Sequence, residues 1–157
     1  MTQSKKKIGN VGYKSDTHFG VGMSYMHFFS IFGDVSIINH TETEIRADLD
    51  LLVIPGGPDV DVTRYLKKDE KINLYVGAPC PIRERFDREL LAKYVENGTP
   101  IFGICRGHQT LVVHFGGTLI QDMWHETNPR DNRRKKVHSV RLNTEYLSSI
   151  GINLTTK

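Results

Sequence analysis

The sequence predicts an α/β fold, a mostly parallel open sheet with helices on both faces. Short apolar runs alternate with longer segments of helical periodicity, and this alternation is typical of parallel sheets built from strand–helix–strand units. Two of the runs are apolar at almost every position, which indicates strands buried on both faces. The expected strands are residues 7–12, 34–38, 50–55 and 100–104.

The two most apolar strands have the clearest ends. Residues 50–55 (DLLVIP) stop at a proline that two glycines follow, and residues 100–104 (PIFGI) run directly into a cysteine. Residues 34–38 (DVSII) are rich in β-branched side chains, which favour strands. Residues 7–12 form the shortest and weakest of the four patterns.

Three segments have the apolar spacing of amphipathic helices. The strongest is 83–97, in which apolar residues recur every three or four positions and charged residues, Asp87 among them, occupy the other face. It ends at Asn97-Gly98, a common helix C-terminus. The other two helices are residues 21–32, with Met23, Met26, Phe29 and Phe32 along one side, and residues 106–115.

The last part of the chain has a weaker pattern. Residues 124–136 are polar and are expected to form a loop, residues 137–142 alternate like an edge strand, and residues 144–150 fit a helical turn. No low-complexity tract or linker divides the chain, and 157 residues suffice for one hydrophobic core. We therefore expect a single domain over residues 1–157.

The composition excludes several classes of protein. Hydrophobic residues make up 38% and charged residues 25%, as in ordinary globular domains, and no apolar run is long enough to cross a membrane. The net charge of +3 is mild, so a nucleic-acid partner is not expected. The one dense basic cluster, within residues 130–136, contains no aromatic residue. A solvated loop is the first interpretation of that cluster, and a site for an acidic or anionic partner is the second.

The two cysteines, Cys80 and Cys105, have neither a disulfide framework nor a secretory leader. They indicate free thiols in a reducing compartment, the cytoplasm. Neither cysteine has histidines at zinc-like spacing, and we expect no metal or other cofactor. Cys80 lies between Pro79 and Pro81 with no base beside it, so we expect it to be structural.

Cys105 lies in Gly103-Ile104-Cys105-Arg106-Gly107, between an expected strand and an expected helix. This is the arrangement of a nucleophile elbow. Its sharp turn brings backbones close on both sides, so the positions two before and two after the nucleophile must be small. The nucleophile is held in a strained conformation, and the positive end of the helix dipole favours its thiolate. The free N–H groups of the helix N-terminus can bind an oxyanion, as acyl transfer requires.

The alternative is that Cys105 is a buried core cysteine, because free cysteine is among the most buried residue types. A second glycine-rich turn, Gly56-Gly57, favours the nucleophile. It also follows an expected parallel strand, and ligands of open α/β sheets gather outside the carboxyl ends of the strands. One of its N–H groups can point at the same carbonyl oxygen as the N–H of Arg106.

Four motifs are spread along the middle of the chain: residues 54–59 (IPGGPD), the Arg85-x-Asp87-x-x-x-Leu91 helix, residues 100–109 (PIFGICRGHQ) and residues 116–122 (GGTLIQD). Together they resemble class I glutamine amidotransferases. The Cys-Arg-Gly-x-Gln stretch, with Gly-Gly-Thr-Leu-x-Gln-Asp after it, is similar to the γ-glutamyl hydrolase branch, which includes γ-glutamyl-γ-aminobutyrate hydrolase. The likeness is dense over residues 51–122.

The resemblance implies a flavodoxin-like fold and attack of Cys105 on a small γ-glutamyl substrate. A γ-glutamyl thioester would form with release of ammonia or an amine, and water would then hydrolyse it. Matching positions imply that the backbone N–H groups of Gly57 and Arg106 form the oxyanion hole. Gln109 would help to hold the glutamyl portion, and Asp59 would lie at the mouth of the pocket.

The catalytic triad of the family is not complete in this chain. The family carries a His-x-Glu triplet well downstream of the nucleophile, whereas no such triplet follows Cys105 and His125 is followed directly by Glu126. The fold is therefore expected to be C-terminally incomplete and the activity low, because general acid–base help is worth about 10² to 10⁴ in rate. The family also usually has proline where Val62 stands and asparagine where Val113 stands, two departures that bear on the substrate.

Three functions are compatible with this pattern. The first is hydrolysis of γ-glutamyl amides by this chain. The second is a glutaminase unit that supplies ammonia to a synthase partner; Gly107-His108-Gln109 also fits that branch, while Arg106 favours the hydrolases. The third is a non-catalytic binding or regulatory relative, and a second chain could also complete the site.

Overall fold

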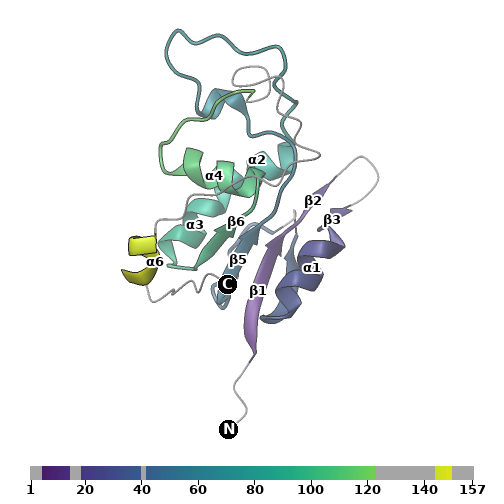
Figure 1. The fold of residues 1–157 in the computed structure, drawn as a ribbon. Helices are drawn as coiled ribbons and strands as arrows, with labels where there is room; N and C mark the ends of the chain where they lie inside the picture. The colour runs from purple at the N-terminus through teal and green to yellow at the C-terminus, as the bar shows by residue number, and fades with distance from the viewer. Residues whose placement is uncertain (1–4, 15–18, 40–41, 123–143, 150–157) are drawn as a thin grey trace. The chain divides into compact units, whose positions relative to one another are not determined.

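The computed structural model describes residues 5–14, 19–39, 42–122 and 144–149 (Figure 1). The chain groups into two compact units, residues 1–123 and 124–157. The second unit contains α6 (Thr144–Ser149), which agrees with the helical turn expected near the end of the chain. The expected loop 124–136 and edge strand 137–142 lie outside the described residues. The single domain expected over the whole chain stays a prediction.

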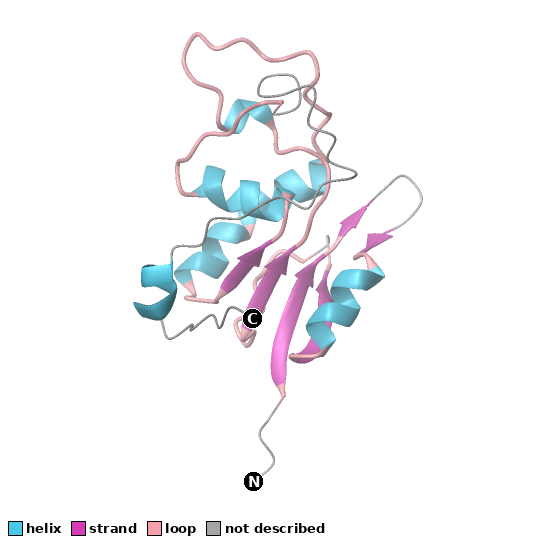
Figure 2. Ribbon diagram, in the orientation of Figure 1, coloured by secondary structure: helices cyan, strands magenta, loops and turns pink. Residues whose placement is uncertain are grey.

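The first unit is built on a four-stranded parallel sheet with the strand order β4-β1-β5-β6 (Figure 2). Ile8 of the inner strand β1 is paired with Val35 of β4 on one side and with Leu51 of β5 on the other. This sheet confirms the predicted α/β class. The strands are β1 (Lys6–Val11), β4 (Gly33–Ile38), β5 (Leu51–Ile54) and β6 (Ile101–Gly103).

Helices cover both faces of the sheet, as the sequence predicts (Figure 1). On one face, α1 (Met23–Ser30) packs through Phe29 against Ile8 and Val53. On the other face, α2 (Pro81–Glu89) and α3 (Leu91–Glu96) pack against Leu52 and Ile54. The two sets of β5 side chains separate in this way because successive residues of a strand point to opposite faces. The last helix of the unit, α4 (Arg106–His114), follows β6 and contacts β5 and β6.

The long helix predicted over residues 83–97 is wrong in one respect: it is two helices, α2 and α3. The break is at Leu90, whose φ of −109° and ψ of −34° depart from helical geometry while its side chain stays buried. Apolar periodicity carries on through the break, so the sequence pattern does not reveal it. The prediction that Asp87 faces outward is also wrong, because its side chain is buried.

The apolar side predicted for the first helix needs a similar correction. Phe29 is buried, but Met23 and Phe32 are 66% and 58% exposed. The helix ends at Ser30, so Phe32 belongs to the turn before β4 and no longer follows the helical face. The inward face is instead formed by Phe29 with Tyr25, which packs against the same cluster.

Two short elements are absent from the prediction. One is the antiparallel pair β2 (Tyr13–Lys14) and β3 (Phe19–Gly20), each strand too short to produce an alternating pattern. The other is the 3₁₀ helix η1 (Val62–Arg64). Asp61 is its N-cap, and the Asp61 side chain accepts a hydrogen bond from the Thr63 N–H.

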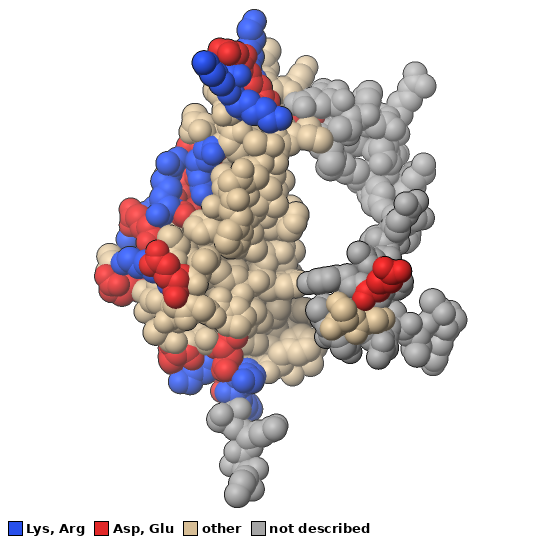
Figure 3. Space-filling view, turned by 90° about the vertical axis from the view of Figure 1, so that its left-hand side faces the viewer, with Lys and Arg blue, Asp and Glu red and all other residues tan. Residues whose placement is uncertain are grey.

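Charged side chains of both signs lie side by side on the face shown in Figure 3, mostly along its rim. Among the described residues of this face, Lys and Arg alternate with Asp and Glu. The basic cluster within residues 130–136 lies outside the described residues, so the absence of a nucleic-acid partner stays a prediction. In the part of the chain that the structure describes, no helix has the length and apolar character needed to span a bilayer.

Candidate active site around Cys105

Cys105 lies in the turn between β6 and α4, where it is the N-cap of the helix, and its thiol is exposed. Its φ of 54° and ψ of −112° put it among the backbone conformations that L-residues rarely adopt. Such a conformation costs about 1–3 kcal/mol and persists only where the surrounding structure enforces it. The structure thus has the strained strand-to-helix turn that the motif predicts.

Two glycines enforce the turn through close backbone contacts. A Cβ added at Gly103 would lie 2.6 Å from the carbonyl carbon of Gly107. A Cβ added at Gly107 would lie 2.6 Å from the carbonyl carbon of Ile54 and would overlap its oxygen. Real Cβ atoms do not approach backbone this closely, so neither position accepts a side chain. The elbow therefore packs directly against the end of β5.

The glycine turn after β5 lies beside the thiol. A Cβ added at Gly56 would be 4.0 Å from the Sγ of Cys105, and one added at Gly57 would be 3.5 Å from the Cδ of Arg106. The two expected oxyanion donors, the amides of Gly57 and Arg106, are therefore in neighbouring segments. The amide of Arg106 belongs to the first turn of α4, where a helix offers its N–H groups no intrahelical acceptor.

Tyr25 adds a hydroxyl group to this site that the sequence analysis missed. Its Oη would be 3.1 Å from a Cβ on Gly56, the same point that is 4.0 Å from the thiol sulfur. Tyr25 belongs to the first turn of α1, and a helix that follows a parallel strand begins at the carboxyl edge of the sheet. That placement is the signal that could have pointed to it.

The side chain of Arg106 points away from the thiol into a buried group of charges. It is 0% exposed, and its Nη2 lies 2.7 Å from the Oε1 of Glu84 and 2.9 Å from the Oδ2 of Asp87. Its Nη1 donates to the Oγ1 of Thr110 at 2.9 Å. Arg64, which is almost completely buried, pairs with the same two carboxylates. Only the main chain of Arg106 is thus placed to meet a substrate.

Arg83 forms a second buried contact, with the glycine turn itself. Its side chain is 0% exposed, and its guanidinium donates to the carbonyl oxygens of Pro55 and Gly56 at 3.0 and 3.2 Å. The sequence analysis missed both arginine side chains. Arg106 meets carboxylates of another helix, and Arg83 meets backbone carbonyls of a distant turn. Neither contact is revealed by a local pattern in one sequence.

The two residues that the resemblance assigns to substrate lie on either side of the elbow. Gln109 is half-buried in the first turn of α4, and its backbone N–H donates to the Cys105 carbonyl at 3.1 Å. Asp59 is exposed, and its Oδ2 accepts a hydrogen bond from the Gly77 amide at 2.9 Å. The carboxylate of Asp59 therefore ties the segment before η1 to the loop that leads to α2.

Gln121, in the last of the four motifs, holds another loop in place. Its Oε1 accepts from the Asn73 amide at 2.7 Å, and its Nε2 donates to Glu70 and to the Lys71 carbonyl, both at 2.9 Å. The bond from Gln121 is the main reason why the pKa of Glu70 lies below its usual value. This part of the motif therefore has a structural explanation.

None of the described histidines forms a hydrogen bond with the thiol. His27 and His108 are exposed, and the ring of His114 packs edge-on against Phe115. The remaining four histidines, His125 among them, lie outside the described residues. One His-x-Glu triplet does occur in the sequence, upstream of the nucleophile at residues 40–42. Its histidine is among the residues not described.

Cys80 differs from Cys105 in each of these respects. It is buried, has ordinary extended backbone angles, and precedes α2, where its carbonyl accepts from the Glu84 amide. This geometry agrees with the structural role predicted for it. Among the described residues no three His, Cys, Asp or Glu side chains form a group that could hold a metal ion. The expectation that no metal is used stays a prediction.

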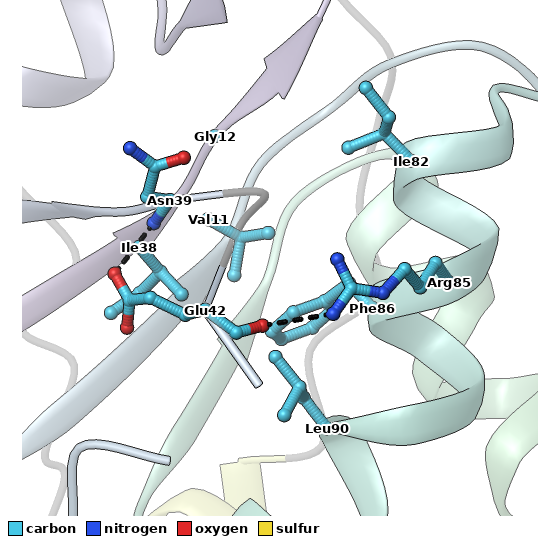
Figure 4. A pocket seen from close by; sticks show the side chains of 9 residues that line it. All are labelled: Val11, Gly12, Ile38, Asn39, Glu42, Ile82, Arg85, Phe86 and Leu90. Atoms are coloured by element: carbon cyan, nitrogen blue, oxygen red, sulfur yellow. Dashed lines mark hydrogen bonds between the residues drawn. The ribbon is translucent and has the colours of Figure 1, made fainter. Parts of the chain in front are cut away.

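A small pocket lies at a different part of the sheet edge (Figure 4). Its lining includes Val11 and Ile38, from the ends of β1 and β4, and Phe86 of α2. Arg85 reaches across it to donate to the Glu42 carbonyl at 3.2 Å. The lining contains none of the residues around the thiol, so we do not assign the chemistry to this pocket.

Comparison with known proteins agrees with the motifs. The sequence model of the peptidase C26 family matches residues 31–153. The glutamine amidotransferase-like protein YvdE homolog of Lactococcus lactis subsp. cremoris is 44% identical over 75 residues, which cover 48% of this chain and 38% of that protein. The YvdE protein of Lactococcus lactis subsp. lactis strain IL1403 is 41% identical over 75 residues, or 48% of this chain and 30% of that one.

A third relative is the glutamine amidotransferase-like protein RP404 of Rickettsia prowazekii, 37% identical over 81 residues that cover 52% of this chain and 28% of the relative. The chain thus spans between 28% and 38% of the length of these three relatives.

Proposed function

The chain belongs to the peptidase C26 family, and we propose that it attacks γ-glutamyl amides with Cys105. The observation that carries this proposal is the pairing of an exposed thiol in a strained elbow with a glycine turn next to it. A strained backbone and an exposed thiol are expected of a nucleophile, whereas a core cysteine would be buried and would gain nothing from the strain. The glycine turn suits an oxyanion hole because it brings backbone N–H groups to the neighbourhood of the sulfur.

In the proposed reaction the Cys105 sulfur adds to the γ-carbonyl carbon of the substrate. The carbonyl oxygen becomes an oxyanion, which the amides of Gly57 and Arg106 stabilise. The C–N bond then breaks, and the nitrogen takes a proton from solvent water as it leaves as ammonia or an amine. Water hydrolyses the resulting γ-glutamyl thioester to glutamate and the free thiol.

Two further residues are proposed to hold the substrate. Gln109 would bind the glutamyl portion from the first turn of α4. Asp59 would lie at the mouth of the pocket, where its carboxylate also accepts the hydrogen bond from the Gly77 N–H. The γ-glutamyl hydrolase branch fits best, because Arg106 follows the nucleophile. A reducing compartment such as the cytoplasm suits a thiol nucleophile.

We propose that this chain by itself completes the second half of the reaction slowly. Hydrolysis of the thioester needs a base, and no His-x-Glu follows Cys105 in the sequence. General acid–base help is worth about 10² to 10⁴ in rate, so the acyl form should accumulate. A second chain or a synthase partner that supplies the base would restore turnover. A binding or regulatory role is the competing proposal, favoured by the same missing triplet.

The test is to mix the purified 157-residue chain with γ-glutamyl 4-nitroanilide and to follow nitroaniline release and intact mass. We expect about one equivalent of nitroaniline, a γ-glutamyl adduct mapped to Cys105, and turnover far below the enzyme median of about 10 per second. The Cys105→Ala variant should give neither adduct nor release, and the Cys80→Ser variant should behave as the original chain.

Two results would contradict the proposal. A chain that forms no adduct over hours would be a non-catalytic relative. A chain that turns over near the enzyme median would already contain the missing base. Limited iodoacetamide provides a separate check, because the exposed Cys105 should be alkylated before the buried Cys80.

A further inference from the structure

We propose that Arg83 is the positioning residue of the oxyanion turn, and that it sets the direction in which the Gly57 N–H points. The inference rests on the proposed function, since an oxyanion turn has a role only if Cys105 is acylated. It adds to that function a residue which touches neither the substrate nor the thiol.

The first step of the argument is the pair of hydrogen bonds that Arg83 makes beneath the turn. Its guanidinium donates to the carbonyl oxygens of Pro55 and Gly56 at 3.0 and 3.2 Å, from a side chain that is 0% exposed. Arginine can bind two carbonyl groups at once because its N–H donors are held in a rigid, planar fork. The two carbonyl groups are thus drawn to the same side of the turn.

The second step follows from the planar trans peptide bond. The carbonyl of one residue and the N–H of the next lie in one plane and point in opposite directions. No described peptide bond is cis. With its carbonyl drawn toward Arg83, Gly56 therefore forces the Gly57 N–H to the opposite side, away from the guanidinium. The same geometry turns the Gly56 N–H away from Arg83.

The third step is that this turn needs an external support. Glycine populates more backbone conformations than any other residue, so a Gly-Gly peptide can rotate at little cost. A rotated peptide would present a carbonyl oxygen where the N–H should be, and that oxygen would repel the developing oxyanion. Packing does not prevent the rotation at Gly57, whose added Cβ would meet no atom closer than 3.4 Å.

The fourth step concerns the helix that carries Arg83. The next residue on α2, Glu84, binds the guanidinium of Arg106 at 2.7 Å, and Asp87 binds it at 2.9 Å. Arg106 supplies the other proposed oxyanion donor through its main chain. One helix therefore holds both donors, the turn through Arg83 and the elbow through its carboxylates.

The test compares two reactions of the same thiol. Acylation by γ-glutamyl 4-nitroanilide passes through an oxyanion, whereas alkylation by iodoacetamide displaces iodide and forms none. In the full chain, Arg83→Met should slow single-turnover acylation about 10²-fold, the loss expected for one oxyanion donor. Alkylation of Cys105 should keep its original rate. The acylation rate of Arg83→Lys should lie between those of the original chain and Arg83→Met. One ammonium group lacks the planar fork that holds both carbonyls at once.

Arg85→Met is the matched control. Arg85 lies on the same helix and also donates to a backbone carbonyl, that of Glu42 at 3.2 Å, but it does so at the far pocket. This variant should acylate and alkylate at the original rates.

The outcomes separate the two proposals. If the original chain is not acylated at all, the proposed function fails. If it is acylated and both Arg83 variants match its acylation rate, only the positioning role is overturned. Equal slowing of acylation and alkylation would also overturn it, since the thiol itself would then be altered. So would failure of both variants to fold, because Arg83 would then serve the core.

Discussion

The two glycine-rich strand ends of this site are held in place by different forces. At the elbow after β6, Gly103 and Gly107 are required because any Cβ would collide with backbone at 2.6 Å. At the turn after β5, Gly56 and Gly57 have more room, and their nearest neighbours are the hydroxyl of one side chain and the guanidinium of another. Steric contact fixes the first, and hydrogen bonds to a buried arginine fix the second.

The difference teaches which substitutions each half of the site can accept. A sterically fixed turn fails as a whole when a side chain is added, because the backbone of a neighbouring strand has to move. A turn fixed by hydrogen bonds accepts small side chains and fails when its donor is removed. The predictions below test this contrast, beginning with the largest effect.

Gly107→Val should produce the largest loss. The branched side chain would meet the carbonyl group of Ile54, so the elbow and the end of β5 cannot both keep their positions. We expect a loss of at least about 3 kcal/mol in the free energy of unfolding, measured by urea denaturation. An unchanged midpoint would show that the helix does not pack against β5 at this residue.

Arg106→Met should follow at about 2–3 kcal/mol, below the usual cost of breaking a buried ion pair, because Arg64 still pairs with the buried carboxylates of Glu84 and Asp87. Arg88→Met is the control. Arg88 pairs with Asp61 at 3.0 Å from a side chain that is 54% exposed, so its loss should cost less than about 1 kcal/mol. Equal losses for the two variants would mean that the buried group gives the elbow no special support.

Gly57→Ala should change stability by less than about 1 kcal/mol. The nearest atoms to its added Cβ are at 3.4 and 3.5 Å, and Gly57 is not among the glycines with positive φ. The thermal midpoints of Gly57→Ala, Gly107→Val and the original chain, measured under the same conditions, would show the contrast directly. A loss as large as that of Gly107→Val would place both turns under steric control and remove the distinction.

The smallest effect is expected from Asp61, which begins η1 just after the glycine turn. The Thr63 hydroxyl is the main reason why the pKa of Asp61 lies below its usual value. A carboxyl whose pKa is lowered on folding stabilises the folded state above its unfolded pKa of about 3.9. That stability is lost as the pH falls through the lower folded value.

The measurement is the difference in thermal midpoint between the original chain and Asp61→Asn, followed from pH 7 to about pH 3. The difference should be small at neutral pH and shrink further in acid. A difference that grows as the pH falls would contradict the assigned direction.

The sequence was sufficient for the four strands of the parallel sheet, for the elbow and for the neighbouring glycine turn, because these depend on local patterns. Apolar runs mark buried strands, and the spacing of Gly103 and Gly107 around Cys105 marks the elbow. The same patterns predicted the carboxyl edge of the sheet as the location of the site.

The buried charges could not be predicted in this way. Asp87 has the charge of a surface residue, and it is buried only because Arg64 and Arg106 reach it from other elements. Charge pairs of this kind depend on the packing of helices that are distant in sequence. Single-residue hydrophobicity therefore assigned Asp87 to the wrong face, and it gave no reason to single out Arg83.

The φ of 54° at Cys105 has a consequence for how this position can change over evolutionary time. Glycine adopts such angles without strain, so Cys105→Gly would relieve the backbone at the residue proposed as the nucleophile. Selection for a more stable protein alone would drift toward glycine there. Stability therefore does not explain a cysteine at this angle, whereas the proposed chemistry does, and relatives without that chemistry should accept glycine at this position.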